Sequence, residues 1–156
     1  MDDHGKVGRC GIYCGACYVY RAQRDGGRFL AETAEQQGVP KDRVKCDGCR
    51  GPEERLWKNC AECSLRECLG EKGLEFCYQC EEFQEGTCEN YERLSEFCGR
   101  RGEDIRASIN HISHNKEDWL REQREKWRCG ICGEPYSWYE TVCHHCGSDL
   151  RRSDLS

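Results

Sequence analysis

The chain has 156 residues, enough for one domain with a small appended module, and its formal net charge is −5 at pH 7. Ile, Leu, Val and Phe together account for only 23 residues, about 15% of the chain, whereas 34% of the residues are charged. A chain so poor in core-forming side chains does not fold by aliphatic burial alone. The 16 cysteines are the feature of the composition that can order it, through disulfides or bound metal.

The cysteines are spaced for metal binding. Six pairs have the form C-x-x-C, in which two thiolates can bind one ion from a single tight turn. We see no apolar leader and no stretch of about 18 apolar residues, so we expect a cytoplasmic protein that has no membrane span and keeps its thiols reduced. Disulfides are the alternative, and they would require an export signal. Thiolate-bound metal would make the protein more acidic still, which disfavours nucleic acid as a partner.

The first cysteine cluster, residues 10–17, reads CGIYCGAC and has the spacing C-x₃-C-x₂-C. Radical S-adenosylmethionine enzymes hold a [4Fe–4S] cluster with this spacing, but they need a large parallel barrel for which this chain has no room. A [4Fe–4S] cluster with a fourth ligand from elsewhere in the chain is the alternative to zinc here. After this cluster, residues 29–35 predict a helix that ends near Gly38 and Pro40.

The twelve cysteines of residues 1–98 can be divided into three sets of four, although other divisions also leave none over. In the first set, Cys46, Cys49, Cys60 and Cys63, two C-x-x-C pairs are separated by ten residues, and the same spacing occurs again near the C-terminus. Cys68 lies close enough in the sequence to replace a ligand of this first set. The sets are Cys46, Cys49, Cys60 and Cys63; Cys68, Cys77, Cys80 and Cys88; and Cys10, Cys14, Cys17 and Cys98.

Residues 99–128 contain no cysteine and are predicted to form a helical connector. Asn115 is typical of an N-cap and would start a second helical segment within it. We expect the tryptophans of this segment to pack between the modules. Apolar residues at helical spacing mark the two halves of the connector, Ile105, Ile109 and Ile112 in the first and Trp119, Leu120 and Trp127 in the second. A short helix before the connector is marked in the same way by Tyr91, Leu94 and Phe97.

Residues 129–150 are predicted to form a zinc ribbon hairpin. A glycine follows each C-x-x-C pair and permits a positive φ, so backbone N–H groups can turn toward the thiolates. Two such knuckles facing one ion give closed tetrahedral coordination, which is structural rather than catalytic. His144 and His145 lie inside the second pair, and we expect them, like His111 and His114, to be solvent-exposed. The predicted ligands are Cys129, Cys132, Cys143 and Cys146.

Residues 10–17 and the CDGC of residues 46–49 resemble the start of a cysteine-rich prokaryotic family that is catalogued as a domain of unknown function. The likeness continues in order through residues 63–68, 71–73 and 77–83, and it covers roughly residues 8–97. Some members of that family carry a helical segment and a zinc ribbon after this domain. The resemblance implies metal binding and a bacterial or archaeal origin, and it implies no reaction.

These patterns predict a small metal-stapled α+β or irregular fold of short helices and cysteine knuckles, with a C-terminal zinc ribbon hairpin. The predicted parts are a cysteine-rich metal-binding domain (1–98), the helical connector (99–128), the ribbon (129–150) and a tail (151–156). No phosphate-binding loop, nucleophile elbow or carboxylate pair indicates an enzyme. We expect an adaptor that holds several zinc ions and presents a rigid surface to a protein partner. The alternative is an iron–sulfur electron-transfer or cluster-handling protein that uses the N-terminal cysteines.

Overall fold

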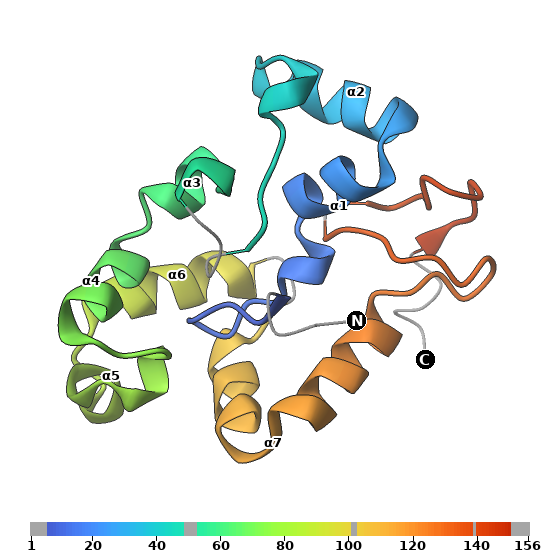
Figure 1. Cartoon of the computed structure of the whole chain (residues 1–156). Coiled ribbons are helices and arrows are strands. Elements are labelled where there is room, and N and C mark those ends of the chain that lie inside the picture. The colour runs from blue at the N-terminus through green and yellow to red at the C-terminus, as the bar shows by residue number, and fades with distance from the viewer. Residues whose placement is uncertain (1–5, 49–52, 101–102, 139, 151–156) are drawn as a thin grey trace.

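The computed structural model describes residues 6–48, 53–100, 103–138 and 140–150, and these are mostly helical (Figure 1). Short 3-10 turns at residues 14–16 and 77–79 carry cysteines of the N-terminal clusters. The predicted tail, residues 151–156, lies outside the described residues. The helices are α1 (Tyr18–Asp25), α2 (Gly27–Gln37), α3 (Lys58–Ala61), α4 (Ser64–Lys72), α5 (Glu81–Glu85), α6 (Glu89–Gly99) and α7 (Ile105–Lys126).

The β part of the predicted fold was wrong, because the described residues contain isolated bridges and no strand. The two C-terminal bridges join Arg128 to Pro135 and Val142 to Asp149, each within one knuckle. The described residues between the knuckles, 136–138 and 140–141, form no bridge with one another, and the Glu140 N–H donates to the Ser137 carbonyl in a turn. Instead, the Trp138 N–H donates to the carbonyl of Ala16, 3.1 Å away in the N-terminal domain. The C-terminal cysteines therefore lie on two linked turns rather than on a ribbon hairpin.

The ends of the helices follow local sequence signals. The predicted helix at residues 29–35 lies within α2, which ends at Gly38 in the left-handed conformation (φ 66°). Asp104 is the N-cap of α7, and its carboxylate accepts the Ala107 N–H. Asn115 interrupts α7 with extended φ and ψ, and its side-chain oxygen accepts the Asp118 N–H at 3.1 Å. Asn115 therefore caps the second half of this helix, as the sequence predicts.

The three isoleucines of the first half of α7 form a buried face, as predicted from their spacing. Ile105 and Ile109 pack against α4 and α6 in a cluster that contains the fully buried Tyr91, whereas Ile112 belongs to the cluster of Trp119. The Tyr91 hydroxyl lies 2.8 Å from the carbonyl of Cys10, to which it donates, and 3.2 Å from that of Ile105. Gly11 passes so close to this helix that a Cβ on it would lie 2.6 Å from the Ile105 carbonyl. The glycine after the first cysteine thus allows the N-terminal loop to contact α7.

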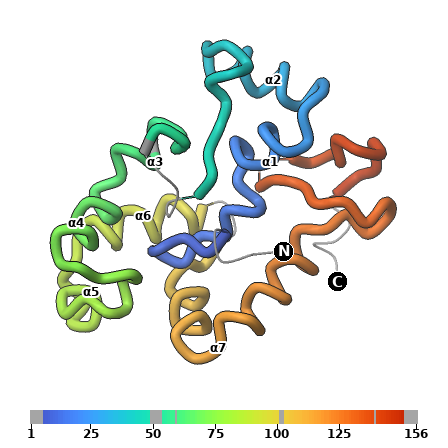
Figure 2. The backbone as a smooth tube through the Cα atoms, viewed as in Figure 1, coloured from blue at the N-terminus to red at the C-terminus, as the bar shows by residue number. Residues whose placement is uncertain are grey.

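A central apolar cluster joins all three predicted parts of the chain. Trp119 is 1% exposed and packs edge-to-face on Tyr13, with ring centroids 6.0 Å apart. Trp127 packs in the same way on Tyr136 of the first knuckle, at 5.6 Å. The predicted packing of these tryptophans between modules is confirmed. Figure 2 shows the N-terminal loop in the middle of the molecule, with α3 to α6 on one side and the C-terminal knuckles on the other. The domain boundaries at residues 98 and 128 stay predictions.

A third cluster packs α1 against α2 and includes Val44, Leu56 and Trp57. It places the end of α1 next to the second knuckle, where Asp25 contacts His144. Within the part of the chain that the structure describes, no helix is both long and apolar enough to cross a membrane.

We predict that Trp119→Ala will destabilise the metal-loaded protein by about 3–5 kcal/mol, because it leaves a cavity between the N-terminal loop and α7. The free energy of unfolding from urea titration, at the same free zinc concentration for each variant, measures this loss. Glu125→Ala on the exposed side of the same helix is the control and should change it by less than about 0.5 kcal/mol. Equal effects of the two variants would show that Trp119 does not hold the modules together.

Candidate metal centre

The two C-terminal knuckles repeat the same backbone hydrogen bonds fourteen residues apart. In the first, the Cys129 N–H donates to the Glu134 carbonyl, and in the second the Cys143 N–H donates to that of Ser148, both at 2.9 Å. Gly133 and Gly147 close the two turns by donating to the carbonyls of Cys129 and Cys143. Both glycines have a positive φ, 80° and 78°, as the sequence predicts for these positions.

The four sulfurs of the two knuckles converge in the geometry of one ion. The Sγ atoms of Cys129 and Cys146 are 3.7 Å apart, and so are those of Cys132 and Cys143. All four sulfurs lie within 4.8 Å of one another. A tetrahedral zinc ion with Zn–S bonds of about 2.3 Å separates its sulfur ligands by about 3.8 Å. The four cysteines are therefore placed to bind a metal such as zinc, and their thiolates would fill its coordination shell.

Hydrogen-bond donors around the sulfurs favour the thiolate form that a metal requires. The Ser148 hydroxyl lies 3.2 Å from the Cys129 sulfur and 3.0 Å from that of Cys146. The hydrogen bond from Ser148, with backbone N–H groups of the first turn, lowers the pKa of Cys129 to about 6. The same hydroxyl lowers the pKa of Cys146. Burial raises the pKa of the Cys143 thiol to about 12, so this ligand needs the charge of the metal to lose its proton.

Four N-terminal cysteines line one small apolar cavity. Its volume is about 20 Å³, and Phe83 and Tyr91 form part of its wall. The Lys72 ammonium lies 3.1 Å from the Cys80 sulfur. Burial of Cys80 raises the pKa of its thiol, but the hydrogen bond from the Lys72 ammonium and nearby backbone N–H groups outweigh this effect, so the pKa lies below its ordinary value. The cysteines on the cavity wall are those of the second predicted set, Cys68, Cys77, Cys80 and Cys88.

In each of the other two predicted sets, the described cysteines are divided between two clusters. Cys46 and Cys60 pack with Cys17 in the cluster of α1 and α2, whereas Cys63 packs beside α4 and α6. The hydrogen bond from Cys60 lowers the pKa of Cys46 to about 6. Cys49 lies outside the described residues, so its place in the first set is open.

The third predicted set is split between the same two clusters. Cys10 and Cys98 pack around Tyr91, while Cys17 lies in the cluster of α1 and α2. Cys14 acts electrostatically on the Cys60 thiol and thus belongs near Cys17 and Cys46. Among the described residues, none of the N-terminal cysteines joins a group with all its ligand atoms within 4.8 Å. Metal binding by these cysteines stays a prediction.

The expectation that His144 is solvent-exposed was wrong. Its side chain is 13% exposed and stacks on Phe29 of α2, with ring centroids 4.2 Å apart. Its Nδ1 lies 2.5 Å from a carboxylate oxygen of Glu140, and its Nε2 lies 2.7 Å from one of Asp25. The Asp25 partner is 119 residues away in the sequence, so no local pattern could have revealed it. The role of Ser148 was also missed, although its place directly after the glycine of the second knuckle is a local signal.

Comparison with known protein families identifies the family of the N-terminal domain. Residues 6–93 match the model of the family described as Protein of unknown function (DUF3795), which is more than half of the chain. The chain belongs to this family. The resemblance found in the cysteine motifs is thereby confirmed, and the C-terminal knuckles lie beyond the matched residues. No curated protein and no solved structure matches the chain.

We predict that Ser148→Ala will lower the zinc affinity of the four-cysteine site by about 10- to 100-fold, because the thiolates of Cys129 and Cys146 lose the one hydroxyl hydrogen that they share. Competition with a chromophoric chelator measures the affinity. Ser113→Ala, at an exposed position on α7, is the matched control and should leave it unchanged. An unchanged affinity in Ser148→Ala would show that the hydroxyl does not support the site.

Proposed function

We propose that the chain is a zinc-binding adaptor that presents a rigid surface to a protein partner. The observation that carries this proposal is the four-sulfur site, whose ligand atoms match one tetrahedral ion and are all supplied by the protein. A site of this kind has no position for a substrate and fixes a structure instead.

Zinc is the element that would order the knuckles. Each knuckle has a single bridge and a few turn hydrogen bonds, too few to hold an isolated turn in water. The buried side chains of Tyr136 and Leu150 then anchor the pair of knuckles in the central cluster. Metal binding would thereby fix the second knuckle against α2, in the manner of other small domains that fold with their metal.

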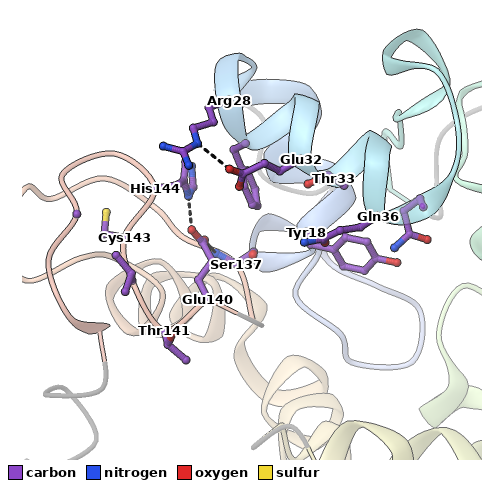
Figure 3. Close-up of a pocket in the computed structure, with 14 residues that line it drawn as sticks. Tyr18, Arg28, Glu32, Thr33, Gln36, Ser137, Glu140, Thr141, Cys143 and His144 are labelled. Carbon is purple, nitrogen blue, oxygen red and sulfur yellow. Dashed lines mark hydrogen bonds and ion pairs between the residues drawn. The ribbon is translucent and has the colours of Figure 1, made fainter.

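The surface we assign to the partner is the groove between α2 and the second knuckle. Its volume is about 810 Å³, and Tyr18, Phe29 and Val142 contribute apolar side chains to its wall. Arg28 and Glu32 form an ion pair on the α2 side of the groove (Figure 3). Val142 is 52% exposed at its rim. Exposed apolar side chains next to a groove are typical of a surface that binds protein, and the charge of −5 disfavours nucleic acid.

We predict that a photo-crosslinking residue at position 142 will give a discrete adduct with one partner in the native host. The same residue at position 97, where Phe97 is 46% exposed on α6, is the matched control and should give none. Val142→Asp should lower the yield of adducts from a crosslinker placed at Gln36 by at least about tenfold, with zinc content unchanged. Identical adduct patterns from positions 142 and 97 would contradict the assignment of this groove.

The N-terminal cavity supports a second candidate function, an iron–sulfur electron-transfer or cluster-handling protein. Four cysteines on one small wall, shielded by Phe83 and Tyr91, provide the thiolate and apolar surroundings that such clusters need. The spacing of residues 10–17 also suits a cluster. Zinc remains the metal we assign to the N-terminal cysteines, because C-x-x-C pairs are the most frequent cysteine pattern in the chain.

We predict that protein purified without oxygen will be colourless and will contain zinc, because zinc has no visible absorption with thiolate ligands. Visible spectroscopy and elemental analysis test this. Brown protein with about four acid-labile sulfides per chain would instead establish a [4Fe–4S] cluster and the second function. A colour lost in Cys77→Ser but kept in Cys129→Ser would place that cluster in the cysteine-lined cavity.

A further inference from the structure

We propose that Asp25, His144 and His145 form a second metal site. It would bind a divalent ion such as zinc and leave one coordination position of that ion open. Asp25 is the last residue of α1, and the two histidines lie between the cysteines of the second knuckle. One oxygen of Asp25, Oδ2, is 2.7 Å from Nε2 of His144 and 3.3 Å from Nε2 of His145. All three ligand atoms lie within 4.8 Å of one another. The site uses none of the cysteines, so it does not depend on the adaptor function.

Each ring nitrogen of His144 faces a carboxylate oxygen, from Glu140 on one side and from Asp25 on the other. A neutral imidazole carries one N–H, and Glu140 lies 2.5 Å from Nδ1, where it accepts that hydrogen. In that tautomer the Nε2 lone pair lies on the side of the Asp25 carboxylate, 2.7 Å away, so one metal ion can bind both atoms. His145 approaches the same carboxylate oxygen, and its ring lies 4.1 Å from that of His144. One divalent ion at this point can therefore bind both imidazoles and the carboxylate.

The separations suit a first-row divalent ion. Ligand atoms about 2.0 Å from a tetrahedral zinc ion are about 3.3 Å apart, which is the distance from Asp25 to His145. The distance from Asp25 to His144 would lengthen by about 0.6 Å on binding. Two imidazoles and a carboxylate are ligands that zinc and its neighbours in the first transition row accept well.

The surroundings hold the ligands in place and supply the charge balance. Glu140 is fixed by the Ser137 N–H, which donates to its other oxygen at 2.6 Å, so its contact to His144 forms the carboxylate–histidine pair common behind metal ligands. Phe29 stacks on the His144 ring and orients it. Arg21 lies 3.6 Å from Oδ1 of Asp25 and leaves Oδ2 to the imidazoles. With neutral imidazoles, the carboxylates of Asp25 and Glu140 exceed the charge of Arg21 by one, which attracts a cation.

Three protein ligands leave a position for water or another small ligand. This is the arrangement of exchangeable metal sites rather than closed structural ones. His144 and Glu140 also line the groove between α2 and the second knuckle, as Figure 3 shows. A small anionic or carbonyl group bound in that groove could therefore reach the fourth position of the ion. The ion would also join α1 of the family domain to the second knuckle.

The test adds Co²⁺ to the full chain after its cysteine sites have been filled with zinc. We expect one further equivalent to bind without sulfur-to-metal charge-transfer bands, since its ligands are nitrogen and oxygen. Asp25→Asn and His145→Ala should each weaken this binding by at least a hundredfold. Glu140→Gln, which alters only the residue that positions His144, should weaken it by about 10- to 100-fold. Zinc content and thermal unfolding before Co²⁺ is added show whether each variant is folded, and His145→Ala changes the more exposed of the two histidines.

The matched control is His111→Ala. His111 lies between the carboxylates of Asp118 and Glu122, and these three ligand atoms also lie within 4.8 Å of one another, but they offer a single imidazole and all come from α7. This variant should bind the further Co²⁺ equivalent as the unaltered chain does. The proposal is overturned if the unaltered chain binds no further equivalent, if His111→Ala loses it, or if Asp25→Asn and His145→Ala retain it. Charge-transfer bands on the added Co²⁺ would likewise overturn it, because they would place the ion on cysteine.

Discussion

The contact between Trp119 and Tyr13 joins the N-terminal cysteine loop to α7 within the apolar cluster against which the C-terminal knuckles pack. A chain with so few aliphatic residues has to build its core from aromatic rings and thiols. Trp119, Trp127 and Tyr136 extend that core from the family domain into the first knuckle. Each of these rings buries more surface than a single aliphatic side chain does, so a few of them can hold the modules together.

The cysteines of the N-terminal domain serve the core as well as any metal. Cys77, Cys80 and Cys98 are buried around Tyr91, and Cys46 is buried against Trp57. A buried thiol packs as a small apolar group, but it resists losing its proton, as the pKa of Cys77 shows when burial raises it to about 12. A bound metal would supply the charge that removes this obstacle. Packing and metal binding therefore favour the same positions for these residues.

The second knuckle is attached to the family domain by polar contacts that the central cluster does not provide. His144 lies between Phe29, Glu140 and Asp25, and each of the two carboxylates faces one of its ring nitrogens. These contacts lie beside the four-cysteine site, since His144 directly follows Cys143 in the chain. Order imposed on the knuckle by zinc would therefore reach the groove at α2 through a single turn of backbone.

The sequence by itself determined the features that depend on neighbours along the chain. The four C-terminal sulfurs lie within 18 residues, and the helix cap at Asn115 and the left-handed Gly38 depend on three or four residues each. The buried isoleucine face of α7 followed from helical spacing in the same way. The family could be recognised as well, because its cysteine motifs occur in a fixed order.

Only the tertiary structure decided which distant groups meet. Trp138 bonds to Ala16 instead of to a neighbouring strand, so the expected ribbon hairpin does not form. Cys17 lies with Cys46 and Cys60, whereas Cys10 lies with Cys98, and the spacing of a C-x₃-C-x₂-C motif cannot distinguish these partners. His144 is buried because α1 and α2 bring Asp25 and Phe29 to it. These pairings depend on how helices pack across the whole chain, whereas spacing constrains only residues that share a turn or a helix face.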